Sequence, residues 1–162
     1  METTRVKRII FSLCLMAIAG LIFTGCSKDD PKPAARKISM KVTITVTGLA
    51  EGDQVDFGIG AGNHDASQYG APVWKINGVT QGNEDHILLG VQEFRANQTY
   101  VLETVKPFDF GSLNASCING LEANTITMSY KVEVDGKAET NVENLVIAGG
   151  QSHNKNYSYQ AK

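Results

Sequence analysis

Apolar and polar residues alternate with a period of two along much of the chain after residue 37. The clearest case is residues 38–47, where five apolar side chains alternate with five polar ones and most are β-branched. This pattern predicts a half-buried β-strand. The alternation resumes at Val55, Phe57 and Ile59, and again over residues 125–134. Such alternation is typical of a sheet with one face on the core and the other in water.

Shorter apolar runs predict further strands over residues 73–79, 87–91 and 99–105, and a last strand around Tyr157 and Tyr159. Asp135-Gly136 predicts a tight type I′ turn, because both central residues of that turn need positive φ. This turn would join residues 125–134 to a return strand over residues 137–148, with a bulge or bend near Glu143-Asn144.

The remaining segments are expected to be connections. Gly58, Gly60 and Gly62 predict a loop over residues 58–70, and polar residues predict loops over 80–85 and 149–156. A phosphate-binding role for this glycine loop is excluded, because residues 72–76 indicate a strand where a helix would have to follow. Residues 106–123 are apolar without a clear period, which favours a long connection between sheets with one helical turn at most.

Seven or eight short strands, without a convincing amphipathic helix after residue 37, predict an all-β fold. We expect a single antiparallel β-sandwich, Ig-like or transthyretin-like, over residues 38–162, with a barrel as the alternative.

The first residues follow another pattern. Cationic residues precede an apolar run, residues 9–23, that is short for a bilayer span. The cations are Arg5, Lys7 and Arg8. The run ends in Phe23-Thr24-Gly25-Cys26, which resembles the lipobox of bacterial lipoproteins, although leucine is commonest where this chain has Phe23. The resemblance implies a signal peptide over residues 1–25 and lipidation of Cys26; the alternative is an uncleaved anchor.

Residues 26–37 follow as a lipidated cysteine and an extended tether, since they contain two prolines and no apolar period. Ser27, Lys28, Asp29 and Asp30 resemble the acidic export signal that sends lipoproteins of Bacteroidetes to the outer face of the outer membrane. The resemblance implies surface display. The alternatives are an anchor facing the periplasm and a merely solvated run of charges.

A second resemblance covers most of the chain after the tether. Thr47-Gly48-Leu49 before a turn, and residues 94–100 leading into a strand, are similar to β-sandwich domains of surface lipoproteins and fimbrillin-related proteins of Bacteroidetes. The chain is short for the two-domain fimbrillin arrangement, which argues against a polymerising pilus subunit.

Charge and cysteine content narrow the functions. Without residues 1–25 the chain has twelve Lys and Arg against sixteen Asp and Glu, a net charge of about −4, and no basic cluster that favours nucleic acid. Cys14 leaves with the signal and lipid occupies Cys26, so Cys117 has no partner for a disulfide. We expect Cys117 to be a buried apolar residue and not a nucleophile.

Polar loop residues offer one candidate for chemistry. If the loops converged, these residues could form a metal site or an acid/base pair: His64, Asp65, Glu84, Asp85 and His86. They lack the spacing of known metal motifs, and the chain has no Gly-x-Ser-x-Gly motif. Solvated loop residues are therefore the favoured interpretation, for His153 beside Asn154 as well, and we expect no enzyme and no cofactor. Asp53 and Asp56 would face opposite sides of a strand, so they cannot act as a pair.

Aromatic residues are the better candidates for binding. Trp74, the single tryptophan, and Tyr69 flank the glycine loop, where a ring could stack on a sugar or a protein, with His64 and Asp65 nearby. Trp74 is favoured as a core residue, which would leave Tyr69, Tyr157 and Tyr159. We expect a non-catalytic envelope binding protein for a glycan or a protein partner. The alternatives are an accessory subunit of a fimbria-like assembly and a metal-dependent hydrolase.

Overall fold

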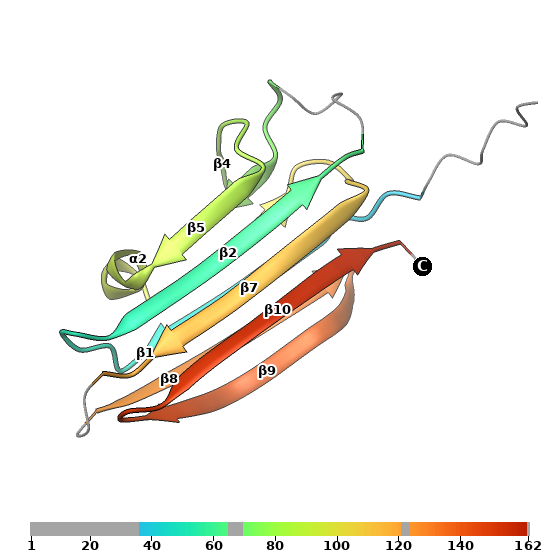
Figure 1. Cartoon of the computed structure of the whole chain (residues 1–162). Helices are drawn as coiled ribbons and strands as arrows, with labels where there is room; N and C mark the ends of the chain where they lie inside the picture. The colour runs from blue at the N-terminus through green and yellow to red at the C-terminus, as the bar shows by residue number, and fades with distance from the viewer. Residues whose placement is uncertain (1–35, 65–69, 121–123, 162) are drawn as a thin grey trace, which may run out of the picture. The chain divides into compact units, whose positions relative to one another are not determined.

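The computed structural model describes residues 36–64, 70–120 and 124–161, within one compact unit, Ala35–Lys162. The predicted signal peptide, Cys26 and the export signal lie outside the described residues, as do Asp65 and Tyr69. Ten strands form two antiparallel sheets that pack face to face (Figure 1). The prediction of an all-β sandwich is confirmed.

The two sheets differ in size. One sheet has six strands in the order β4 (Val79–Thr80), β3 (Trp74–Ile76), β6 (Thr99–Thr104), β1 (Met40–Thr47), β8 (Thr125–Val134) and β9 (Lys137–Ala148). The other has four strands in the order β10 (Ser152–Gln160), β7 (Phe110–Ile118), β2 (Gln54–Gly62) and β5 (His86–Gly90). The chain therefore alternates between the sheets and covers both faces of one core.

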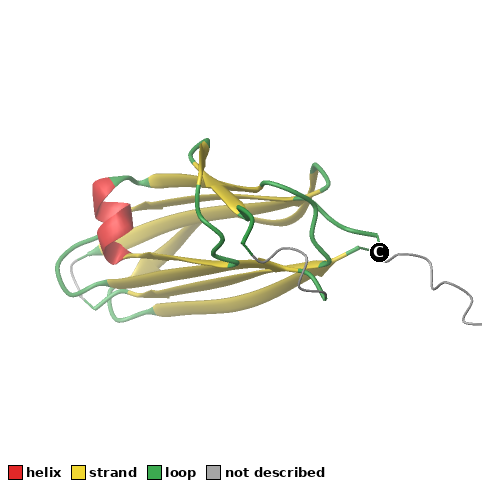
Figure 2. Cartoon of the chain, turned by 90° about the horizontal axis from the view of Figure 1, so that it is seen from above, coloured by secondary structure: helices red, strands yellow, loops and turns green. Residues whose placement is uncertain are grey.

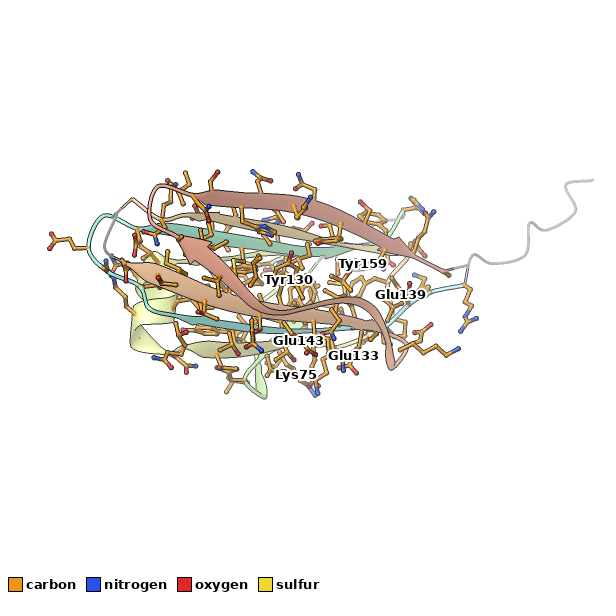
Figure 3. All side chains as sticks on the ribbon, turned by 90° about the horizontal axis from the view of Figure 1, so that it is seen from below. Lys75, Tyr130, Glu133, Glu139, Glu143 and Tyr159 are labelled. Atoms are coloured by element: carbon orange, nitrogen blue, oxygen red, sulfur yellow. The ribbon has the colours of Figure 1, made fainter. Side chains whose placement is uncertain are left out.

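The core lies between the sheets, where the alternation places the apolar side chains of each strand. Phe57 of β2 contacts rings from two other elements, with ring centroids 5.5 Å from Phe94 and 5.9 Å from Tyr130 of β8. Tyr130 and Tyr159 lie between the layers, whereas Lys75 and Glu133 lie on the outer side of the six-stranded sheet (Figure 3). Burial of each large apolar side chain contributes about 1.5–3 kcal/mol.

A short helix, α2 (Val91–Ala96), closes one end of the sandwich between β5 and β6 (Figure 2). The Glu93 carboxylate accepts a hydrogen bond from the Gly90 amide at 2.9 Å, and Phe94 is buried. The sequence pattern gave no convincing amphipathic helix here, because six residues are too few to show a 3.6-residue period. No helix of the described ranges is long and apolar enough to cross a membrane.

The turn predictions have mixed outcomes. Asp135 (φ 51°) and Gly136 (φ 76°) form the predicted turn, and β9 shifts register near Asn144 (φ 50°), where the bulge was expected. The single strand over residues 73–79 was wrong. Asn77 (φ 49°) and Gly78 (φ 82°) make a second turn of the same kind and divide it into β3 and β4.

Three expected connections were also partly wrong. Residues 58–62 belong to β2, the expected connection over residues 106–123 contains β7, and β10 begins at Ser152. In β7 the inward positions hold Leu113 and the smaller Ala115 and Cys117, while the strand begins and ends with the outward apolar residues Phe110 and Ile118. These outward apolar residues and the small inward ones weaken the apolar alternation of the strand.

Candidate functional site

The outer face of the four-stranded sheet carries a stripe of glycines along β2, at Gly58, Gly60 and Gly62. Aromatic rings lie against this stripe. A Cβ atom on Gly58 would lie 3.1 Å from His86 Nε2, and one on Gly62 would lie 2.6 Å from Phe110 Cζ. A side chain at residue 62 would therefore displace the Phe110 ring from this position.

Between these two rings lies a shallow hollow of about 240 Å³, called here the glycine-floored pocket. Gly60 is paired with His86 of β5 on one side and with Ser112 of β7 on the other. The lining consists of Gly60, Ala61, Gly62, Asn63, Asp85, His86, Phe110 and Ser112. Peptide backbone thus forms a flat floor, with a ring at each end and hydroxyl, amide and imidazole groups around it.

Buried groups hold one rim of this pocket. The Trp74 indole Nε1 donates to the Asp85 carbonyl oxygen at 3.3 Å, and the Ala61 amide donates to the same oxygen at 3.0 Å. The backbone just before His86 is therefore tied both to the core and to β2. Such restraint of the start of β5 keeps the His86 ring over the floor.

A second set of hydrogen bonds holds the opposite rim. Asn63 Oδ1 accepts from Lys37 Nζ at 3.0 Å and from the Asp109 amide at 3.1 Å, and Asp109 Oδ2 accepts from the His64 amide at 2.8 Å. The His64 ring centroid lies 5.5 Å from that of Phe110. The loop after β2 is thereby fastened to the start of β7, and His64 extends the aromatic edge of the pocket.

The candidate role of Trp74 in an aromatic platform was wrong. Trp74 has an exposed fraction of 0%, so its ring cannot stack on a ligand, and the core interpretation is confirmed. Tyr159 is buried, and the half-buried Tyr157 bonds to the Tyr130 hydroxyl at 3.0 Å between the sheets. The exposed ring of this face is instead Phe110, which is 43% exposed and which the sequence analysis placed in a connection.

The polar loop residues only partly converge. His64 and His86 both flank the pocket, Asp85 lines it, and Glu84 is exposed nearby in sequence. Within the part of the chain that the structure describes, no three His, Cys, Asp or Glu side chains are grouped closely enough to hold a metal ion. His153 lies elsewhere and bonds to the Tyr130 hydroxyl at 3.0 Å, so it is not the solvated loop residue that was expected.

The remaining titratable candidates, Asp53, Asp56 and Cys117, lie away from the pocket lining. Asp53 is buried and accepts hydrogen bonds from the Ala50 amide, the Gly120 amide and Asn124 Nδ2, whereas Asp56 is exposed on the outer face. The two carboxylates therefore do not form a pair, as predicted. Cys117 is buried, as predicted, and burial raises the pKa of its thiol to about 11.

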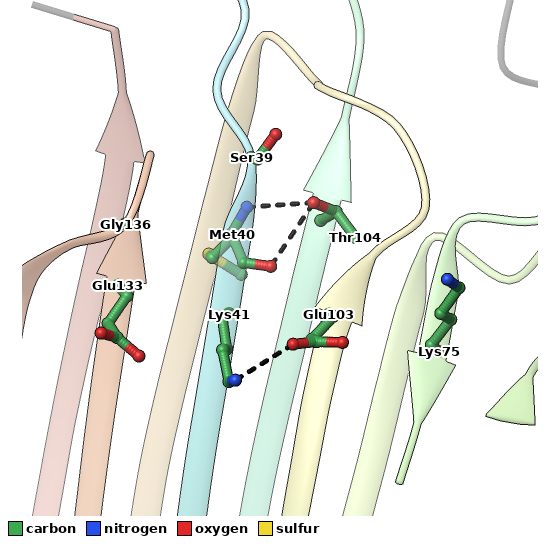
Figure 4. Close-up of a pocket in the computed structure, with 8 residues that line it drawn as sticks. All are labelled: Ser39, Met40, Lys41, Lys75, Glu103, Thr104, Glu133 and Gly136. Atoms are coloured by element: carbon green, nitrogen blue, oxygen red, sulfur yellow. Dashed lines mark hydrogen bonds and ion pairs between the residues drawn. The ribbon is translucent and has the colours of Figure 1, made fainter. Parts of the chain in front are cut away.

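A larger hollow, of about 380 Å³, lies on the outer face of the six-stranded sheet (Figure 4). Charges of alternating sign cross it on four neighbouring strands: Lys75, Glu103, Lys41 and Glu133. Lys41 Nζ lies 3.1 Å from Glu103 Oε1, and Lys131 Nζ lies 2.9 Å from Glu133 Oε1. These charges neutralise one another, so this ladder favours cross-strand stabilisation over capture of a ligand.

Comparison with known proteins shows the fold. No family model matches the chain, and neither does any curated protein. A DUF4425 family protein from Bacteroides ovatus is 16% identical (TM-score 0.53; 76% of this chain, 95% of that chain). A domain of unknown function, DUF4425, from Bacteroides vulgatus is 15% identical (0.52; 78% and 96%). The calcium-bound form of a Parabacteroides distasonis protein is 17% identical (0.57; 82% and 99%). The chain shares its fold with these proteins.

Proposed function

We propose that this protein is a lipid-anchored, non-catalytic binding protein of the cell envelope, exposed on the outer membrane, and that it binds a glycan in the glycine-floored pocket. The observation that carries the proposal is the side-chain-free backbone of the glycine stripe, against which the His86 ring, the Ser112 hydroxyl and the Phe110 ring lie. Flat rings stack on the apolar faces of sugars, and the polar lining matches their hydroxyl groups.

The form of the pocket supports binding without catalysis. Its floor is backbone, and among the described residues Asp85 is the one carboxylate in its lining. Paired carboxylates, which glycoside hydrolysis ordinarily needs, are therefore absent from this lining. A flat, pre-formed surface of this kind suits recognition of a ligand that is released unchanged.

A glycan array tests the pocket directly. The purified protein, in a detergent whose headgroup carries no sugar, is compared with Phe110→Ala, His86→Ala and the control Val146→Ala, an exposed apolar residue of the other sheet. We expect selective binding that both pocket variants lose and the control keeps. If the wild-type protein bound neither neutral nor acidic glycans on the array, this result would contradict the proposal and favour a protein partner.

The same array tests whether glycan binding depends on calcium. Since Asp85 is the one carboxylate that the described residues contribute to the pocket lining, we expect glycan binding to be equal in millimolar calcium and in EDTA. The calcium-bound neighbour makes this comparison necessary. Loss of binding in EDTA would show that a metal site supports the ligand.

The anchor has its own experiment. Cys26→Ser is expected to leave an unlipidated, uncleaved precursor, because the resemblance to the lipobox assigns lipid to that sulfur. Surface exposure is measured by protease treatment of whole cells, and Asp29→Ala with Asp30→Ala is expected to reduce it. Normal processing of Cys26→Ser would contradict the lipoprotein proposal.

The fimbria-like alternative makes a different prediction. β1 is hydrogen-bonded to β6 on one side and to β8 on the other, so its removal would open a gap in the middle of the six-stranded sheet. An accessory subunit would fill that gap with a strand of another molecule. Oligomers formed by a chain that lacks β1, and dispersed by an added β1 peptide, would favour this alternative over the glycan proposal.

A further inference from the structure

We infer that the binding site continues from the pocket across β7 and β10, so that its ligand is an uncharged glycan chain of several sugars. This inference rests on the proposed function. It begins from the register of the sheet, because residues paired directly across antiparallel strands share a face. Ser112 is paired with Gly60 on one side and with Ser158 of β10 on the other, so the row that crosses the pocket floor continues to the edge of the sheet.

The next rows repeat this composition. Asn114 is paired with Gly58 and with Asn156, and Ser116 is paired with Asp56 and with Asn154. The three serine and three asparagine side chains therefore form a continuous outward patch, called here the amide-hydroxyl patch. It consists of Ser112, Asn114, Ser116, Asn154, Asn156 and Ser158. The two strands that carry it, β7 and β10, lie side by side in Figure 1.

This patch has unused hydrogen-bonding capacity. Asn114 Nδ2 donates to Asn156 Oδ1 at 2.7 Å. This bond does not use the amide hydrogens of Asn156 or the side-chain oxygen of Asn114, so a ligand can bond to them. Among the described residues, the side chains of Ser112, Ser116, Asn154 and Ser158 make no hydrogen bond to another protein group. Hydroxyl groups of a polysaccharide both donate and accept, so they match this mixture of groups.

The charge of the face selects among glycans. The outward positions of the four-stranded sheet include one carboxylate, Asp56, and within the described strands they include no Lys or Arg. Lys155 of β10 is paired with the buried Ala115, which places it on the inward face at the edge. A sulfated or uronic-acid chain would find no cation along these rows, and Lys37 at the pocket rim is already held by Asn63 and Asp109, whereas a neutral chain needs no cation.

The dimensions favour a chain over a single sugar. From β5 to β10 the face spans three inter-strand spacings, about 14 Å, which exceeds the length of one sugar ring. The pocket would hold one sugar, and the amide-hydroxyl patch would hold those that follow. The residues of β10 are therefore expected to contribute to the affinity for long ligands only.

The test uses neutral gluco-, xylo- and manno-oligosaccharides of two and six units, with oligogalacturonides as acidic probes, titrated calorimetrically. The variant is Asn156→Ala with Ser158→Ala, both on exposed positions of β10. Its matched control is Asn141→Ala, an exposed asparagine of β9 that also bonds to a neighbouring side chain. Thermal unfolding confirms that every variant is folded.

We expect at least one neutral series to bind, the six-unit member about ten-fold more tightly than the two-unit member, from two or so added hydrogen bonds. The β10 variant should lose that gain and keep the affinity for two units; Asn141→Ala should change neither, and Phe110→Ala should weaken both. Equal affinities for two and six units, a β10 variant like wild type, or preference for the acidic probes would overturn this inference alone. Absence of binding to every probe would overturn the proposed function with it.

Discussion

Replacement of Trp74 by Phe separates a core tryptophan from a binding platform. The indole is fully buried and its Nε1 donates to the Asp85 carbonyl oxygen. Loss of this bond costs about 1 kcal/mol, and the smaller ring costs roughly 1 kcal/mol more in packing. The Asp85 oxygen still accepts from the Ala61 amide, so no buried acceptor is left without a partner. The expected loss in the free energy of unfolding is about 2 kcal/mol.

For a domain the size of Ala35–Lys162, such a loss lowers Tm by about 8 °C. Trp74→Ala is less informative, because its cost of about 3–5 kcal/mol approaches the whole stability of a small domain. Unfolding is followed by far-UV circular dichroism, since the variant has no tryptophan left for fluorescence. The control is Val79→Ala, an exposed residue of the neighbouring β4, with an expected change below about 0.5 kcal/mol.

Two results would refute this reasoning. A Trp74→Phe protein as stable as wild type would show that the indole is not packed in the core. Ready quenching of the native tryptophan fluorescence by acrylamide would show that Trp74 is exposed. Either result would return Trp74 to the role of a platform.

The remaining predictions concern three sites. Gly62→Ala should weaken glycan binding as much as Phe110→Ala does, because the added Cβ displaces the ring, while urea unfolding shows a change below about 1 kcal/mol; unchanged affinity would contradict this. Burial lowers the pKa of His153, so the unfolded chain binds the proton more readily than the folded chain does. The free energy of unfolding should therefore fall as the pH drops below about 6.5 and level off below the folded pKa. In His153→Gln this part of the pH dependence should vanish. Since the thiol of Cys117 is buried and its pKa is raised to about 11, a thiol reagent at pH 8 should label it in urea but not in the native protein; rapid native labelling would contradict its placement.

The fold could be predicted where each strand pairs apolar inward residues with polar outward ones. Residues 40–47 and 125–134 follow this rule along their whole length, and both are central strands of the six-stranded sheet. Their burial decides the pattern, so local sequence and tertiary structure agree. The turn at Asp135-Gly136 could be predicted for the same reason, since its backbone conformation demands particular residues.

The candidate site could not be predicted, because its strands break that rule. Gly58, Gly60 and Gly62 lower the strand propensity of β2, and the outward Phe110 hides the alternation of β7. Residues 58–62 of β2 and the whole of β7 were taken for connections, yet β2 and β7 pair with each other along their whole length. Departures from local consistency of this kind concentrate at functional sites, which agrees with the proposed role of the pocket.

The pocket also brings together residues that are far apart in the sequence, and no local pattern reveals such contacts. His86 and Ser112 reach Gly60 from strands that lie on either side of β2. Sequence analysis singled out His64, Asp85 and His86 because of their chemistry, but the packing of β5 and β7 against β2 decides which of them line the pocket.

The most direct test of the account is an NMR titration of the ¹⁵N-labelled protein with the glycan that binds best on the array. Glycine amides fall in a distinct region of the spectrum, so the floor can be followed residue by residue. We predict that the largest shifts occur at Gly58, Gly60, Gly62 and Ser112 and that they are absent in Phe110→Ala. Shifts confined to the charged hollow around Lys41 and Glu103, or no shifts at saturating glycan, would contradict the central claim.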